Sequence, residues 1–87
     1  MVTLSHPATA VPTIMEHLRT GGATDLRAAT NHVWIVGRAP SGRLMQMLWD
    51  PTHHGYYVSH WPPGQMAAEP LGVFSEPDAA VARALQA

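Results

Sequence analysis

The chain has 87 residues, of which 46% are apolar and 13% are charged, and its net charge is −1. This length fits one small domain, and the apolar content excludes a disordered chain or a charged tail. Its five basic residues are all arginines, against six acids, a balance that argues against a general binder of nucleic acid or acidic membranes. Cysteine is absent, which excludes disulfides, thiolate zinc sites and cysteine nucleophiles.

The first predicted element is a helix that follows a loose N-terminal arm at residues 1–8. Thr9 is the expected N-cap, and the glycine pair at 21–22 is expected to end the helix. Apolar side chains recur with the spacing of one helical stripe. The stripe consists of Val11, Ile14, Met15 and Leu18. Residues 24–30 are expected to form a connection or a short second helical turn.

Strands are predicted next, because β-branched and aromatic residues alternate with turn signals. Residues 32–38, 43–50 and 56–61 are the three expected strands, and residues 70–74 are a short fourth strand at an edge. Residues 39–42 and 51–55 are the expected turns, and residues 62–69 are a loop. In the first turn, Pro40 comes early and Gly42 last, as a type I turn followed by a bulge prefers.

A second helix is predicted at residues 78–86. Ser75 and Asp78 have the spacing of a capping box, and the side chains expected to face inward are Ala79, Val81, Ala82 and Leu85. The whole order predicts an α+β fold, in which a three- or four-stranded antiparallel meander is flanked by an N-terminal and a C-terminal helix. Residues 9–87 are expected to form this single domain.

The hairpin turns predict which side chains share a face of the sheet. If Arg38 lies opposite Arg43 and Asp50 lies opposite Tyr56, one face is rich in Trp and Met. The residues of this face are Trp34, Val36, Met45, Met47, Trp49, Tyr57 and Trp61, with Arg38 and Arg43 at one end and His32 toward the other. The residues of the second face are Val33, Ile35, Leu44, Gln46, Leu48, Tyr56, Val58 and His60.

The Trp/Met face is the predicted partner-binding surface, because Trp and Tyr are enriched at binding hot spots and Met packs adaptably. Three interpretations stay open: one helix covers each face, the face forms a homodimer, or it is a platform for another macromolecule or a small ligand. Trp49 and Trp61 are the leading anchors. The full predicted set is Trp34, Met45, Met47, Trp49, Tyr57 and Trp61, with Arg38 and Arg43 as a polar rim.

The histidines and serines point to no specific catalytic or metal chemistry. His53, His54 and His60 lack the spacing of a zinc site, and Ser59 and His60 are adjacent in a strand and so point to opposite faces. No catalytic residue, metal or cofactor is therefore predicted. For an enzyme, the candidate participants are His32, His60 and Asp50.

The sequence thus predicts a non-catalytic interaction or regulatory module, of the inhibitor or adaptor type found in bacteria or phages, that forms a homodimer or binds a protein partner. Two alternatives are a nucleic-acid-binding sheet that uses Arg38, Arg43 and aromatic stacking, and a small histidine-dependent enzyme or metal-binding protein. No secretory signal pattern and no apolar run long enough to span a membrane is found, so the expected location is the cytoplasm.

Overall fold

The computed structural model describes residues 7–29, 34–50 and 52–87, which form two α-helices and five β-strands. In chain order these are α1 (Pro7–Thr20), β1 (Thr24–Ala29), β2 (Trp34–Arg38), β3 (Leu44–Asp50), β4 (Gly55–His60), β5 (Glu69–Phe74) and α2 (Pro77–Leu85). The predicted α+β class, the antiparallel meander and the two flanking helices are confirmed. The prediction of three or four strands is wrong, since the described residues contain five.

β1 is the strand that the sequence did not indicate, because its segment was expected to be a connection. It pairs antiparallel with β2, and the pairing is interrupted between Thr24 and Arg27. Asp25 lies in this irregularity with a φ of 55°. The bulge breaks the alternation by which a strand is recognised, and pairing with β2 rather than intrinsic propensity makes the segment a strand.

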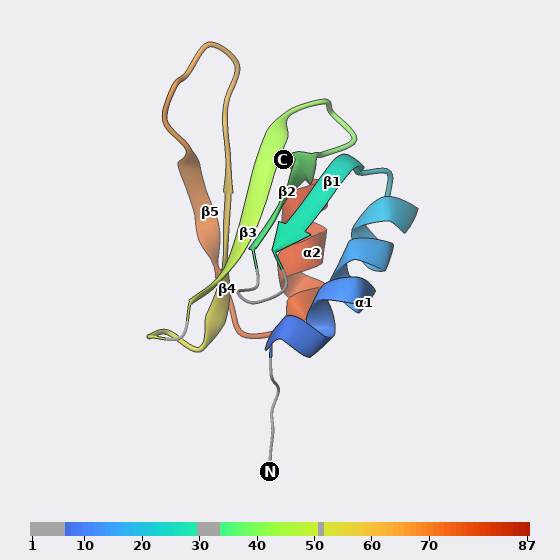
Figure 1. Ribbon diagram of the computed structural model, residues 1–87. Helices are drawn as coiled ribbons and strands as arrows, with labels where there is room; N and C mark the ends of the chain where they lie inside the picture. Colours follow the sequence, from blue (N-terminus) through green and yellow to red (C-terminus); the bar gives the residue numbers. More distant parts are fainter. Residues whose placement is uncertain (1–6, 30–33, 51) are drawn as a thin grey trace.

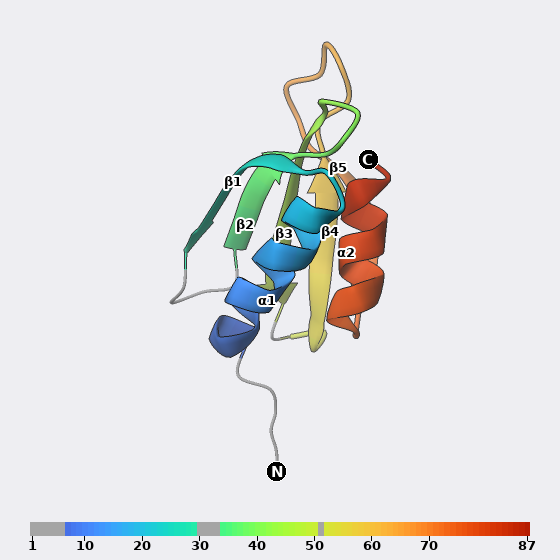
Figure 2. The same cartoon turned by 90° about the vertical axis from the view of Figure 1, so that its right-hand side faces the viewer.

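The strands follow the chain across the sheet in the order β1-β2-β3-β4-β5, and both α1 and α2 lie on the same side of it (Figures 1 and 2). α2 contacts β3, β4 and β5, whereas α1 contacts β1 and α2. The interpretation in which one helix covers each face is therefore wrong. We call the side toward α1 and α2 the helix face and the opposite side the open face.

The core lies between the helix face and the two helices. The buried residues of α1 are Val11, Ile14 and Leu18, and those of α2 are Ala80, Val81 and Ala84. The strands contribute Ile35, Met45, Met47, Tyr56 and Val58. The small alanine side chains let α2 approach the sheet closely, so that the larger side chains of the strands fill the space between the layers.

α1 begins at Pro7, so Thr9 lies within the helix and is not its N-cap. Of the predicted N-terminal arm, residues 1–6 lie outside the described residues. The predicted end of the helix is confirmed: Gly22 has a φ of 103°, and the Ala23 N–H donates to the Leu18 carbonyl at 2.9 Å. This is the geometry of a Schellman ending, which glycine adopts without strain.

The predicted capping of α2 is wrong. The N-cap is Glu76, which makes no side-chain capping bond, and Pro77 follows at the start of the helix. The helix is therefore rotated relative to the prediction, because the contacts with the sheet select its buried stripe. Ala79 and Ala82 are exposed, while the buried residues of the helix are Ala80, Val81 and Ala84. Of the four side chains expected to face inward, Val81 is therefore buried and Leu85 packs partly buried against the core.

The predicted register of both hairpins is wrong by one residue. Arg38 pairs with Leu44 rather than Arg43. The Ala39 N–H donates to the Arg43 carbonyl, and the Gly42 N–H donates to the Ala39 carbonyl. Gly42, with a φ of 89°, is the bulge residue itself, which leaves a loop of three residues and lets Ala39 pair with Arg43.

In the second hairpin, Asp50 pairs with Gly55 rather than Tyr56. His54 takes the left-handed conformation, with a φ of 48°, so the glycine is not used for the turn. Gly55 is instead the first residue of β4, where an added Cβ would lie 3.1 Å from the Phe74 carbonyl oxygen of β5. A close approach between strands, and not turn geometry, thus requires glycine at this position.

Candidate interaction surface

Because each hairpin is shifted by one residue, the predicted Trp/Met face is divided between the two sides of the sheet. Directly paired residues share a side, and the pairing places Arg27 of β1 on the open face, together with residues on and directly after the strands β2 to β5. They include Trp34, Val36, Arg38, Leu44, Gln46, Leu48, Tyr57, Ser59, Trp61, Pro70 and Val73. No helix among the described residues covers them (Figure 1).

One row of the open face is wholly apolar or aromatic and crosses four strands. It consists of Trp34, Leu48, Tyr57 and Val73, which are successive pairing partners on β2, β3, β4 and β5. Trp34 is 37% exposed and Val73 is 45% exposed, at the two ends of this apolar row. Leu48 and Tyr57, between them, are partly exposed. A contiguous accessible apolar patch marks an interaction site more often than ordinary surface does.

The next row has two polar residues at its centre, Gln46 and Ser59, between Val36 and Pro70. The Gln46 amide Nε2 donates to the Ser59 hydroxyl at 3.0 Å, while the Gln46 Oε1 lies 3.4 Å from the Trp34 indole nitrogen. Ser59 is fully buried, so this bond provides the partner that its hydroxyl requires. The row thus fixes the orientation of Gln46 and connects it to the apolar row.

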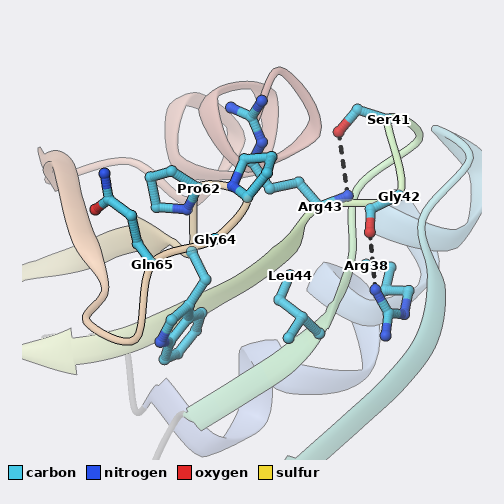
Figure 3. Close-up of a pocket in the computed structure, with 10 residues that line it drawn as sticks. Arg38, Ser41, Gly42, Arg43, Leu44, Pro62, Gly64 and Gln65 are labelled. Atoms are coloured by element: carbon cyan, nitrogen blue, oxygen red, sulfur yellow. Dashed lines mark hydrogen bonds between the residues drawn. The ribbon is translucent and has the colours of Figure 1, made fainter.

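At the end of the open face lies a groove of about 460 Å³, which we call the arginine groove (Figure 3). It is lined by Arg38, Ser41, Gly42, Arg43, Leu44, Trp61, Pro62, Pro63, Gly64 and Gln65. Leu44 lies between Arg38 on one side and the Gly64–Gln65 side of the loop on the other. The sequence indicated Arg38, Arg43 and Trp61 as partner-binding residues, and its Pro-Pro-Gly run indicated the loop after β4 but not that this loop lines a groove.

Hydrogen bonds to backbone carbonyl groups order both walls of the arginine groove. On one wall, the Arg38 side chain donates from Nη1 to the Gly42 carbonyl at 2.9 Å, and its Nε lies 3.5 Å from an Asp25 carboxylate oxygen. On the other wall, the Gln65 N–H donates to the Pro62 carbonyl at 3.1 Å and closes a turn. The Trp61 N–H donates to the Leu44 carbonyl at 2.9 Å, which joins the two walls.

The other predicted partner-binding residues lie on the helix face. Met45 and Met47 are fully buried in the core. Trp49 is half-buried and packs edge-on against Tyr56, with ring centroids 5.1 Å apart. Of the eight predicted residues, the structure therefore brings Arg38, Arg43 and Trp61 together in the arginine groove and Trp34 and Tyr57 together in the apolar row.

The residues considered for catalysis do not come together. Asp50 pairs with Gly55 at one end of β4, His60 lies at the other end, and His32 lies outside the described residues. The Nδ1 of His53 lies 2.6 Å from an Asp50 carboxylate oxygen. This hydrogen bond holds the pKa of Asp50 below its ordinary value, and burial opposes the shift. The backbone N–H groups of Thr52 and His53 also donate to Asp50, so the carboxylate orders a turn.

His60 is buried on the helix face, where it pairs with Met45, and its Nε2 lies 3.2 Å from a Glu69 carboxylate oxygen. Since a carboxylate accepts, Nε2 carries the proton, and Nδ1 then has no hydrogen-bond partner among the described residues. Over the same part of the chain, no three His, Asp or Glu side chains gather as a metal site would require. Neither helix described here is long and apolar enough to cross a membrane.

Comparisons with models of known protein families, with curated proteins and with solved structures found no match to this chain.

Proposed function

We propose that this chain is a non-catalytic interaction module that pairs with a second copy of itself through the open face. One observation carries the proposal: α1 and α2 lie on the same side of the sheet, and the apolar row stays uncovered by any described helix. Apolar area removed from water contributes roughly 25 cal/mol per Å² before the costs of association are subtracted.

The distribution of charge on the open face also supports a protein–protein interface. The apolar row contains no charged residue, and two arginines of this side lie beside it: Arg27, paired with Val36 at the sheet edge, and Arg38 at the groove. An uncharged centre with a polar rim is the usual anatomy of a protein interface. A second copy presents the same uncharged row, so pairing it with itself buries no charge.

Nucleic acid is the weaker candidate for the open face as a whole. Phosphate contacts dominate the affinity of nucleic-acid-binding proteins, whereas this chain has a net charge of −1. Arg38 is moreover already close to Asp25. The arginines on this side could hold one or two anionic groups, but they do not form the continuous cationic track that a phosphate backbone requires.

The test is the molar mass in solution, measured by light scattering at two concentrations. We expect a mass of twice 9.4 kDa for the wild type and a monomer for the double variant Trp34→Ser/Val73→Ser, which makes both ends of the apolar row polar. Met66→Ser is the matched control, because Met66 is 98% exposed in the loop between β4 and β5 and belongs to neither the row nor the groove.

Circular dichroism establishes that each variant is folded before its mass is compared. A wild-type mass of 9.4 kDa at both concentrations contradicts the proposal. So does a folded double variant that stays dimeric, since self-association would then use another surface. Loss of the dimer in the Met66→Ser control would indicate that the loop between β4 and β5, and not the apolar row, forms the dimer interface.

A further inference from the structure

Asp50 places a carboxylate on the open face directly beside the apolar row. The pairing of β3 with β4 continues without interruption from Leu48 to Asp50, so both residues are on the same side of the sheet, about 7 Å apart along the strand. The Asp50 side chain is only 28% exposed. It lies at the end of the sheet opposite the loop between β4 and β5 (Figure 1). A negative charge thus adjoins the row without belonging to it.

His53 is the charged partner of this carboxylate when its ring is protonated. Its Nδ1 lies 2.6 Å from Asp50 Oδ2, while Asp50 Oδ1 accepts from the backbone N–H groups of Thr52 and His53. Because a carboxylate accepts, Nδ1 carries a proton in both charge states of the ring. The proton that a histidine gains or loses between about pH 5 and 8 is therefore the one on Nε2 here. The charge of the pair can change without breaking the hydrogen bond.

Among the described residues, Asp50 and His53 set the charge at this end of the open face. The other titratable side chains around the turn are His54, Tyr56, Tyr57 and Glu76. His54 packs edge-on against Trp49 of the helix face, and Glu76 acts on Tyr56 of that same face. Tyrosines stay uncharged until about pH 10. The charged residues of the neighbouring strands, Arg38 on β2 and Glu69 on β5, pair at the opposite ends of β3 and β4.

A partner that buries the apolar row must also cover the residues beside it. A stable protein interface removes about 800 Å² from water on each partner, which four partly exposed side chains do not supply. The adjacent pairs are Gln46 with Ser59 on one side and Asp50 with Gly55 on the other. Covering Asp50 removes water from its carboxylate, which is costly unless a positive charge stays beside it. Protonated His53 supplies that charge, whereas neutral His53 does not.

We propose that self-association through the open face depends on pH, with His53 as the titrating residue. The inference rests on the self-association proposed above and adds its regulation. Since covering Asp50 favours the protonated ring, the two copies take up protons when they pair. A group that binds its proton more tightly in the dimer stabilises the dimer at low pH, and this contribution is lost as the pH rises. The dimer is therefore tighter at a pH of about 5.5 than at about 8, while carboxylates are ionised at both.

The test is the dissociation constant of the dimer, measured by light scattering over a dilution series at these two pH values and one ionic strength. For the wild type we expect a constant about tenfold lower at the acidic pH, since each dimer contains two such pairs. His53→Gln keeps an amide donor for Asp50 but cannot gain a charge. The dissociation constant of this variant should change less than about twofold between the two pH values.

His54→Asn is the matched control, because it removes the neighbouring histidine, which packs on the helix face. Asparagine tolerates the left-handed conformation of this position, where φ is 48°. The control should keep the wild-type response to pH, which separates His53 from the general rise in positive charge on acidification. Circular dichroism at both pH values establishes that each variant is folded.

Three results would overturn the proposal: a dimer that weakens on acidification, a response that survives in His53→Gln, or equal effects of the two histidine variants. Failure here is separable from failure of self-association. A dimer whose affinity is the same at both pH values rejects only this inference, whereas a chain that is monomeric at both rejects self-association itself.

Discussion

The two faces of the sheet are built from neighbouring residues of the same strands, yet only one of them is covered by the two helices (Figure 1). Met45 and Met47 are fully buried under α1 and α2, while Leu44, next in sequence to Met45, is 40% exposed on the open face. Both faces are apolar, so hydrophobicity alone does not decide which side chains form the core. The side on which the helices pack decides it, and the open face keeps apolar side chains that the monomer does not bury.

The largest expected effect is on the helix face. Met47→Ala removes a fully buried side chain and should lower the free energy of unfolding by about 2–4 kcal/mol, because a cavity remains under the helices. Urea denaturation followed by circular dichroism measures this loss. A loss below about 1 kcal/mol would show that the helix face is not the tightly packed side.

A smaller loss of stability is expected at Gly37 of β2, because residues of β1 lie very close to it. An added Cβ at Gly37 would lie 2.7 Å from a methyl group of Leu26 and 2.9 Å from the Thr24 carbonyl oxygen. Gly37→Ala should therefore displace β1 and cost about 1–3 kcal/mol. Amide hydrogen exchange should show faster exchange in β1 than in β3, and unchanged exchange in β1 would contradict this account.

A pair of valines gives the sharpest comparison, since the same atoms are removed on each side. Val58 is fully buried on the helix face and Val73 is 45% exposed on the open face. Measured where the protein is monomeric, Val73→Ala should cost about 0.5 kcal/mol or less, and Val58→Ala several times more. Equal losses in denaturant would mean that the open face is packed as well as the core.

The smallest effect is expected at the end of the sheet, in the turn after β3. The His53 hydrogen bond lowers the pKa of Asp50, so its stabilising contribution is complete above the unfolded pKa of about 4 and is lost as the pH falls through the lower folded value. The difference in Tm between wild type and Asp50→Asn should be constant near neutral pH and shrink on acidification. A difference in Tm that persists below pH ~3 would show that it does not come from the ionised carboxylate of Asp50.

The sequence predicts the class of fold and most element positions because those signals are local. The stripe of Val11, Ile14 and Leu18 and the glycine ending of α1 depend only on residues within a few positions of one another. β1 has no comparable signal, since its bulge at Asp25 interrupts the alternation and its pairing with β2 is a tertiary contact.

The site is predicted less completely, because face assignment depends on the number of residues in each turn. A bulge at Gly42 and a left-handed His54 each shift the register by one residue, which moves Met45, Met47 and Trp49 into the core side and brings Leu44 and Leu48 to the open face. Trp34, Tyr57 and Trp61 keep their common side, since both errors cancel between β2 and β4. The side of the sheet on which α2 packs depends on contacts across the whole fold, so no local sequence pattern predicts it.

The contact between α1 and α2 has a consequence for how the chain folds. Every strand pairing joins segments that are neighbours in sequence, whereas the two helices come from opposite ends of the chain and meet where Leu85 lies against Gly21. Contacts between distant segments carry the larger loop-closure cost, so the hairpins are expected to form first and the helices to dock last. A circular permutant that links the helices and opens the chain in the loop between β4 and β5 would turn that final long-range step into a local one and should fold faster.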